Sequence, residues 1–172
     1  SKQYIDSETE TIESMNNLIE WLPNNLPTEK KTSIVHGDYS LTNVMVGKDN
    51  PNVIAILDWE LSTLGDPCAD FNYHCLQYTM NPKLADKDYC ISKGIPIIED
   101  YVQMYSEKIE IDLTEEWELY SAYNLFKLAG ILQGILGRVR DGTAANQNAA
   151  ERASGVKNLS DTAWDLVQKN FL

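Results

Sequence analysis

Two short polar segments contain the residue types that transfer of a phosphoryl group requires. Asp38 and Asn43 stand five residues apart, and Asp58 closes an apolar run fifteen residues after Asn43. A carboxylate such as Asp38 can accept the proton of an attacking hydroxyl, while the oxygens of Asn43 and Asp58 are hard ligands suited to Mg²⁺. The spacing therefore predicts a catalytic base and a magnesium site that act together on a phosphate donor.

Two neighbours of Asp38 are expected to shape its loop. Gly37 permits backbone conformations that are closed to other residues. His36 is interpreted as a hydrogen-bonding residue that organises the loop rather than as an acid–base catalyst. The chain has only two histidines, His36 and His74, so it cannot build a multi-histidine metal centre.

The elements that must position these residues are short strands. Apolar, β-branched runs predict strands at 33–35, 43–46 and 53–57, and the Gly/Asp/Asn/Pro-rich segment 47–52 predicts a hairpin loop between the last two. Antiparallel pairing would bring Asn43, at the start of one strand, beside Asp58, at the end of the other.

The remainder of the chain has helical periodicity. Apolar residues at helical spacing predict helices over residues 7–22 (with Ser7 as its cap), 67–79, from about 96 to 109, 115–140 and 146–169. The helix at 115–140 is apolar nearly all round, which predicts a central position. The expected fold class is α+β, mainly helical, with a small β-hairpin that carries the catalytic and metal-binding residues.

Composition narrows the function classes. The 172 residues have a net charge of −12 and show no basic cluster, which argues against a nucleic-acid partner. No apolar run approaches the ~18 residues that span a membrane. The three cysteines are odd in number and lack Cys-x-x-Cys spacing, so we expect a reducing intracellular compartment, without a choice between cytoplasm, mitochondrion and peroxisome.

The two motifs resemble a known superfamily of kinases. His36-Gly37-Asp38 and the segment 56–60 (Ile-Leu-Asp-Trp-Glu) are similar to the catalytic and metal-binding motifs of the aminoglycoside phosphotransferase and choline kinase superfamily. The longer segment 57–67, with Ala69 and Asp70, is most similar to the phosphotransferase-like domain associated with acyl-CoA dehydrogenases. The resemblance extends from about residue 4 to residue 166.

This resemblance implies a kinase-like fold, with ATP and Mg²⁺ as cofactors and a small-molecule hydroxyl as acceptor. The link to acyl-CoA dehydrogenases implies a hydroxylated acyl-CoA as acceptor and a fused or neighbouring dehydrogenase as partner. By the same resemblance Asp38 is the catalytic base, Asn43 and Asp58 bind the metal and nucleotide phosphates, and Asp70 braces the catalytic loop.

Half of such a kinase is not visible in the sequence. No Gly-x-Gly-x-x-Gly loop and no strand with a phosphate-binding Lys precede residue 36. We therefore expect residues 1–172 to be the C-terminal, catalytic-loop lobe of a kinase-like domain, separated from its N-terminal nucleotide lobe by cloning, proteolysis or gene prediction. Such a lobe is expected to be inactive alone and to expose apolar surface.

Three alternatives remain open from the sequence. A pseudokinase or binding module would keep this fold without transfer, a magnesium-dependent hydrolase would use water as the nucleophile, and a purely structural domain would have no use for Asp38, Asn43 and Asp58. The cations Lys127, Arg138 and Arg140 either meet a phosphorylated or CoA-bearing substrate or lie solvated at the surface.

Overall fold

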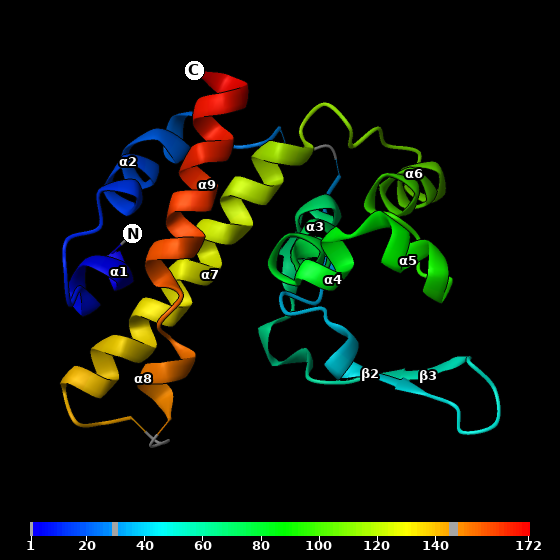
Figure 1. Cartoon of the computed structure of the whole chain (residues 1–172), viewed down its shortest axis with the longest axis horizontal. Helices are drawn as coiled ribbons and strands as arrows, with labels where there is room; N and C mark the ends of the chain where they lie inside the picture. Colours follow the sequence, from blue (N-terminus) through cyan, green and yellow to red (C-terminus); the bar gives the residue numbers. More distant parts are fainter. Residues whose placement is uncertain (1, 29–30, 145–147) are drawn as a thin grey trace. The chain divides into compact units, whose positions relative to one another are not determined.

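The computed structural model describes residues 2–28, 31–144 and 148–172, and it is mainly helical with two small antiparallel sheets (Figure 1). The α+β class expected from the sequence is confirmed. The chain forms two compact units, one made of residues 1–27 and 118–172 and the other of residues 28–117. We call them the helical unit and the site unit. Within the described ranges, no helix combines the length and apolar character needed to cross a membrane.

The helical unit is organised around two helices from opposite ends of the chain, α2 (Glu13–Trp21) and α9 (Val156–Phe171), which pack along each other (Figure 1). Met15 and Leu18 of α2 and Ala163 and Val167 of α9 are fully buried. The unit is completed by α1 (Lys2–Ser7), η1 (Leu22–Asn24), nearly all of α7 (Trp117–Arg140) and α8 (Ala149–Arg152).

A buried polar contact fastens the N-terminal segment to α7. The amide of Gln133, which has no exposed surface, donates hydrogen bonds to the carbonyl of Ser7 (2.7 Å) and to the hydroxyl of Thr9 (3.1 Å). The predicted helix over 7–22 is therefore wrong at its start. Ser7 ends α1, where its hydroxyl donates to the Tyr4 carbonyl (3.1 Å), and α2 begins only at Glu13.

The site unit contains both sheets. Strand β1 (Ser33–Val35) pairs with β4 (Thr63–Gly65), and β2 (Val44–Val46) pairs with β3 (Val53–Ile56) to form a hairpin that extends away from the helices of this unit (Figure 1). The remaining elements are η2 (Leu41–Asn43), η3 (Trp59–Leu61), α3 (Pro67–Met80), α4 (Pro82–Ala85), α5 (Lys87–Lys93) and α6 (Ile98–Ile109).

Aromatic side chains join α3 to α6 in the core of the site unit. The Phe71 ring stacks on Tyr105, with centroids 3.8 Å apart, and meets Tyr101 edge-on at 5.1 Å. Such pairs stabilise a core beyond the area they bury. They fix α3, the helix that carries Asp70, against its neighbour.

Most of the expected elements are confirmed, including the hairpin and the helices expected at 67–79, from about 96 to 109 and at 115–140, which are α3, α6 and α7. The predicted helix over 146–169 is interrupted, since α8 ends at Arg152 and α9 begins after Gly155, a residue that weakens helices. Positions 146 and 147 of that prediction lie outside the described residues. Strand β4 and helices α4 and α5 were not predicted.

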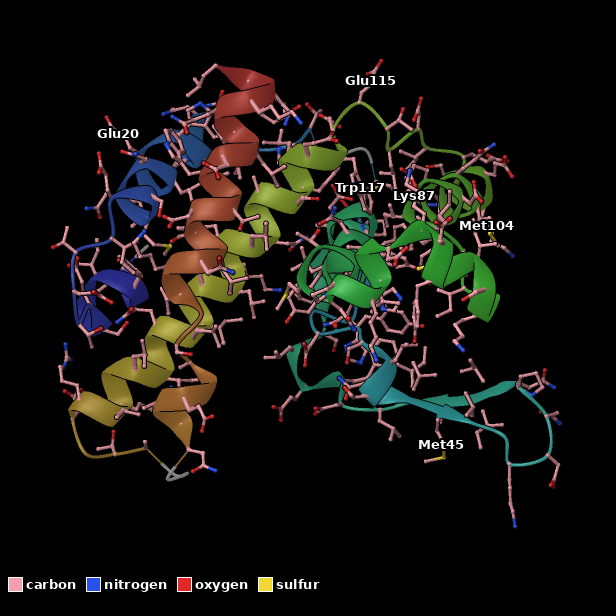
Figure 2. All side chains as sticks on the ribbon, in the orientation of Figure 1. Glu20, Met45, Lys87, Met104, Glu115 and Trp117 are labelled. Carbon is pink, nitrogen blue, oxygen red and sulfur yellow. The ribbon has the colours of Figure 1, made fainter. Side chains whose placement is uncertain are left out.

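The two sheets leave large apolar side chains in solvent. Figure 2 shows the Met45 side chain projecting outward from the hairpin, and Leu41, Ile34 and Leu64 keep more than two thirds of their surface exposed, at 76%, 71% and 71%. The other exposed large apolar residues of this region are Val46, Val53, Ile54, Leu57, Trp59 and Leu61. The exposed large apolar side chains are most numerous around the candidate site, and whether another lobe covers them in the parent protein stays a prediction.

Candidate active site

The loop that follows β1 can only be built with glycine at position 37. Gly37 has φ +82°, in the left-handed region that side chains disfavour. A Cβ atom at this position would also lie 2.5 Å from the carbonyl oxygen of Leu61, which is backbone and cannot move aside. Conformation and close approach therefore both require the glycine, and together they set the direction in which the chain continues to Asp38.

Asp70 of α3 holds this loop through its backbone. Its carboxylate accepts hydrogen bonds from the N–H groups of His36 (2.7 Å) and Gly37 (2.9 Å). Local sequence places Asp70 there, because Asp66 caps α3 by accepting from the N–H of Cys68 (2.8 Å) and Pro67 occupies the first helical position. Asp70 is thus in the first turn of a helix whose start is well defined.

His36 connects the loop to the segment that carries Asp58. Its ring is buried, with 3% of the residue exposed. The Nδ1 atom accepts from the N–H of Asp38 (3.3 Å), and Nε2 lies 2.7 Å from the carbonyl oxygen of Leu57. Because a backbone N–H can only donate and a carbonyl can only accept, these contacts assign the tautomer with its hydrogen on Nε2.

The hairpin brings Asn43 and Asp58 to the same end. The Leu57 N–H donates to the Asn43 carbonyl (2.8 Å), immediately beyond the paired residues Val44 and Ile56. The side-chain amide of Asn43 donates to the Asp38 carbonyl (3.0 Å), which makes its amide oxygen the atom suited to a cation. Asn43 is therefore hydrogen-bonded both to the backbone of Asp38 and to the backbone of Leu57, the residue before Asp58.

Asp58 has an unusual backbone conformation. It lies in the left-handed region, with φ 66° and ψ 52°. Its side chain makes no capping hydrogen bond to the short helix η3 that follows. Such a conformation costs of order 1 kcal/mol for a residue other than glycine and is concentrated at functional sites. The turn redirects the chain after β3, and it leaves the Asp58 carboxylate exposed beside the hairpin end.

The donor set fits Mg²⁺ bound together with phosphate. Among the described residues, no cluster of three or more His, Cys, Asp and Glu side chains could hold a metal by itself. Mg²⁺ commonly takes only one or two protein ligands and completes its octahedron with substrate phosphates and water. One carboxylate from Asp58 and one amide oxygen from Asn43 match that requirement, whereas a zinc site would need more protein ligands.

Two further residues of α3 lie close to the loop, and the sequence did not single them out. Burial first, and then the negative charge of Asp38, raise the pKa of Tyr73 to about 12. The His74 ring lies 5.1 Å from the Tyr39 ring, and burial lowers the pKa of His74 against the opposing effect of Asp70. Their spacing of three and four residues from Asp70 on a helix was the available signal.

Arg140, one of the three cations considered for substrate binding, forms hydrogen bonds at the end of α7. The Arg140 guanidinium donates to the Asp141 carboxylate (2.8 Å) and to the carbonyl of Glu8 (2.9 Å), both within the helical unit. Arg140 therefore connects the end of α7 to the N-terminal segment.

A profile of the phosphotransferase enzyme family matches residues 1–121, a range that contains the loop, the hairpin and α3. The chain belongs to this family. A solved structure of a Ralstonia eutropha protein assigned to the aminoglycoside phosphotransferases superposes on this chain with a TM-score of 0.91 at 40% identity. The superposed region includes 99% of this chain and 54% of the Ralstonia eutropha chain. The α+β architecture described above is therefore that of the kinase-like phosphotransferases.

Relatives of this phosphotransferase segment include much longer proteins. It is 38% identical to acyl-CoA dehydrogenase family member 10 of Mus musculus and 32% identical to acyl-CoA dehydrogenase family member 11 of Homo sapiens, over 98% and 99% of its own length. It spans only 16% and 23% of those two relatives. The association with acyl-CoA dehydrogenases inferred from the motifs is confirmed.

Proposed function

We propose that this chain is the catalytic-loop lobe of an ATP-dependent phosphotransferase that acts on the hydroxyl group of a small molecule. The observation that carries the proposal is the connection of Asp38, Asn43 and Asp58 through the Asp70-held loop and the hairpin end. Positioning and electrostatics supply most of the catalysis of phosphoryl transfer, and this arrangement provides both.

Each residue has a defined part in the reaction. The acceptor oxygen forms a bond to the γ-phosphorus while the bond from that phosphorus to the oxygen of the departing ADP breaks, and Asp38 takes the acceptor's proton. Asn43 and Asp58 would hold Mg²⁺ together with the phosphates, through an amide oxygen and a carboxylate. When bound, Mg²⁺ neutralises charge on the phosphate oxygens. His36 keeps the Asp38 and Asp58 segments in a fixed relation through its two ring nitrogens.

The acceptor we propose is a hydroxylated acyl-CoA. Support comes from the relatives named as acyl-CoA dehydrogenase family members, which place a similar segment in the same polypeptide as an acyl-CoA-linked activity. A kinase in the same polypeptide as such an enzyme would meet the same class of acyl-CoA thioester, which makes that class our proposed acceptor.

The test uses the full-length protein that carries this segment, with Mg²⁺ and ATP labelled in the γ-phosphate. Acceptors are acyl-CoA thioesters with a hydroxyl at C3, C4 or C5, matched thioesters without a hydroxyl, and water alone. We expect label in a phosphorylated thioester only when the hydroxyl is present. Equal release of inorganic phosphate in every mixture would indicate a hydrolase, and nucleotide binding without any transfer would indicate a pseudokinase.

A second comparison concerns the 172 residues by themselves. The chain covers 54% of the Ralstonia eutropha structure, which supports the proposal that further nucleotide-binding residues lie in the rest of the parent protein. We expect the isolated segment to transfer phosphate at a small fraction of the parent's rate under identical conditions. Equal rates per molecule would contradict this part of the proposal and assign the whole nucleotide site to these residues.

A further inference from the structure

We propose that Trp59 is a positioning residue that holds Asp58 in the conformation in which its carboxylate binds Mg²⁺. This inference rests on the part of the proposed function that assigns Asp58 to the metal, and it concerns the same site. Trp59 directly follows Asp58 and begins η3. Its indole makes a hydrogen bond and a ring contact, although 46% of the residue is exposed.

The backbone of Asp58 needs support from its neighbours. Its φ of 66° and ψ of 52° lie in the left-handed region, where residues other than glycine persist only if the surrounding structure holds them. The Asp58 side chain does not supply this support as a cap, since it makes no capping hydrogen bond to η3. We therefore expect the residues on either side of Asp58 to hold the turn.

Hydrogen bonds are present on both sides of Asp58. Before it, the Leu57 carbonyl accepts from Nε2 of His36 (2.7 Å). After it, Nε1–H of Trp59 donates to the carbonyl of Ile56 (2.8 Å), the last residue of β3. The Trp59 bond therefore joins the start of η3 to the end of β3 and closes the turn around Asp58.

The indole ring also contacts His36. The two ring centroids are 4.8 Å apart, and the ring planes are inclined by 49°. His36 is only 3% exposed, and its Nδ1 accepts from the N–H of Asp38 (3.3 Å). Through this contact, Trp59 links the turn at Asp58 to the loop that carries Asp38.

Tryptophan is suited to both contacts. The indole N–H is a donor only, so it can satisfy a backbone carbonyl while the ring packs against a neighbour. Phenylalanine offers the aromatic ring without the donor. A change from Trp59 to Phe therefore removes the hydrogen bond to Ile56 and keeps an aromatic ring beside His36.

The direction of the Asp58 carboxylate matters because the proposed site offers few protein ligands. Mg²⁺ requires near-ideal octahedral geometry and is commonly bound through one or two carboxylates together with phosphates. A turn that relaxed out of the left-handed region would move the Asp58 carboxylate relative to the amide oxygen of Asn43. Loss of the Trp59 hydrogen bond should therefore weaken the binding of ATP with Mg²⁺ and leave the binding of ATP alone unchanged.

The test is Trp59→Phe in the full-length protein, with ATP binding measured by calorimetry in the presence and absence of Mg²⁺ and without an acceptor. Loss of one hydrogen bond predicts about three- to tenfold weaker ATP binding with Mg²⁺ and wild-type binding without it. In the transfer assay, the Mg²⁺ concentration at half-maximal rate should rise by a similar factor. The KM for the acceptor should stay at the wild-type value.

The matched control is Trp21→Phe in the helical unit. The Trp21 ring also contacts another ring, with the centroid of Phe171 at 5.8 Å, and phenylalanine keeps an aromatic ring at this position. We expect the control to bind ATP as the wild type does, both with and without Mg²⁺. A loss of Mg²⁺-dependent binding in the control equal to that in Trp59→Phe would overturn the inference.

A double-mutant cycle at Asp58 separates positioning from packing. In an Asp58→Asn background, Trp59→Phe should cause no further loss of Mg²⁺-dependent binding, because the carboxylate that Trp59 positions is gone. Three results would each overturn the inference: the same fold-loss in both backgrounds, the same loss with and without Mg²⁺, or wild-type binding in Trp59→Phe.

The outcomes also distinguish this inference from the proposed function. If Asp58→Asn loses the Mg²⁺ dependence of ATP binding while Trp59→Phe keeps it, only the role of Trp59 fails. If Asp58→Asn keeps the wild-type dependence, the metal-binding role of Asp58 and the role of Trp59 fail together. If the parent protein shows the expected effect of Trp59→Phe but transfers no phosphate, the proposed transfer fails and the role of Trp59 stands.

Discussion

The contacts inside the helical unit differ in kind from those inside the site unit. In the helical unit, α2 and α9 bury Met15, Leu18 and Val167 completely. In the site unit, the strands around the candidate site leave apolar side chains exposed, and the loop that carries Asp38 is held by polar contacts from Asp70 and His36.

This difference indicates a division between stability and chemistry. Burial contributes free energy without fixing the direction of any one polar group, whereas hydrogen bonds contribute less net stability but define direction. We therefore expect substitutions in the helical unit to change the free energy of unfolding and substitutions in the site unit to change turnover. The predictions below test that separation in the full-length protein, from the largest expected effect to the smallest.

The largest effect is expected at Asp38. Asp38→Asn keeps the size of the side chain but removes the base that we propose, so kcat should fall by about 10²- to 10⁴-fold. The melting temperature should stay at the wild-type value, because the loop backbone contacts of His36, Gly37 and Asn43 remain. Measurement of both quantities on one preparation tests the comparison directly; a lowered melting temperature with normal kcat would reverse it.

Leu18→Ala should give the opposite result. Removal of a fully buried Leu from the α2–α9 contact should lower the free energy of unfolding by about 2–5 kcal/mol, measured by denaturant titration. Well below the melting temperature, kcat per folded molecule should be unchanged. Glu20→Ala, an exposed position of the same helix (Figure 2), is the matched control and should leave both quantities unaltered.

Substitution of Asp70 is expected to change both turnover and stability. Asp70→Asn removes the charge that accepts from two loop N–H groups, and hydrogen bonds to charged groups are each worth about 1.5–3 kcal/mol. We expect kcat to fall less than in Asp38→Asn and the melting temperature to fall as well. Asp165→Asn, an exposed position on α9, serves as control. A change in melting temperature alone would make Asp70 purely structural.

The smallest effect is expected at a surface ion pair. Lys157 and Asp161, one turn apart on α9, form a salt bridge between exposed side chains. Exposed pairs contribute little because solvent screens them. Lys157→Ala should therefore leave both the melting temperature and kcat within error of wild type at physiological salt. A clear drop in melting temperature would mean that surface charge as well as burial stabilises this unit.

Prediction from the sequence worked where a local pattern decides the structure. The β-branched runs and the turn-rich segment between them were sufficient for the β2–β3 hairpin, and helical periodicity was sufficient for α3, α6 and α7. It was less successful for short elements. Strand β4 has three residues and exists only because β1 pairs with it, and α1 ends where a cap for the following helix was expected.

The sequence by itself determined the chemistry that we propose for the site, because Asp38, Asn43, Asp58 and Asp70 are residue types at fixed spacings along the chain. Only the tertiary structure decided how these groups are held. The Asp70 carboxylate accepts from loop N–H groups more than thirty residues earlier in the chain, and His36 contacts both the Asp38 loop and the Leu57 carbonyl. Such contacts join segments that are distant in sequence. Their geometry depends on how α3 packs against the loop, which the spacing of residues along the chain does not determine.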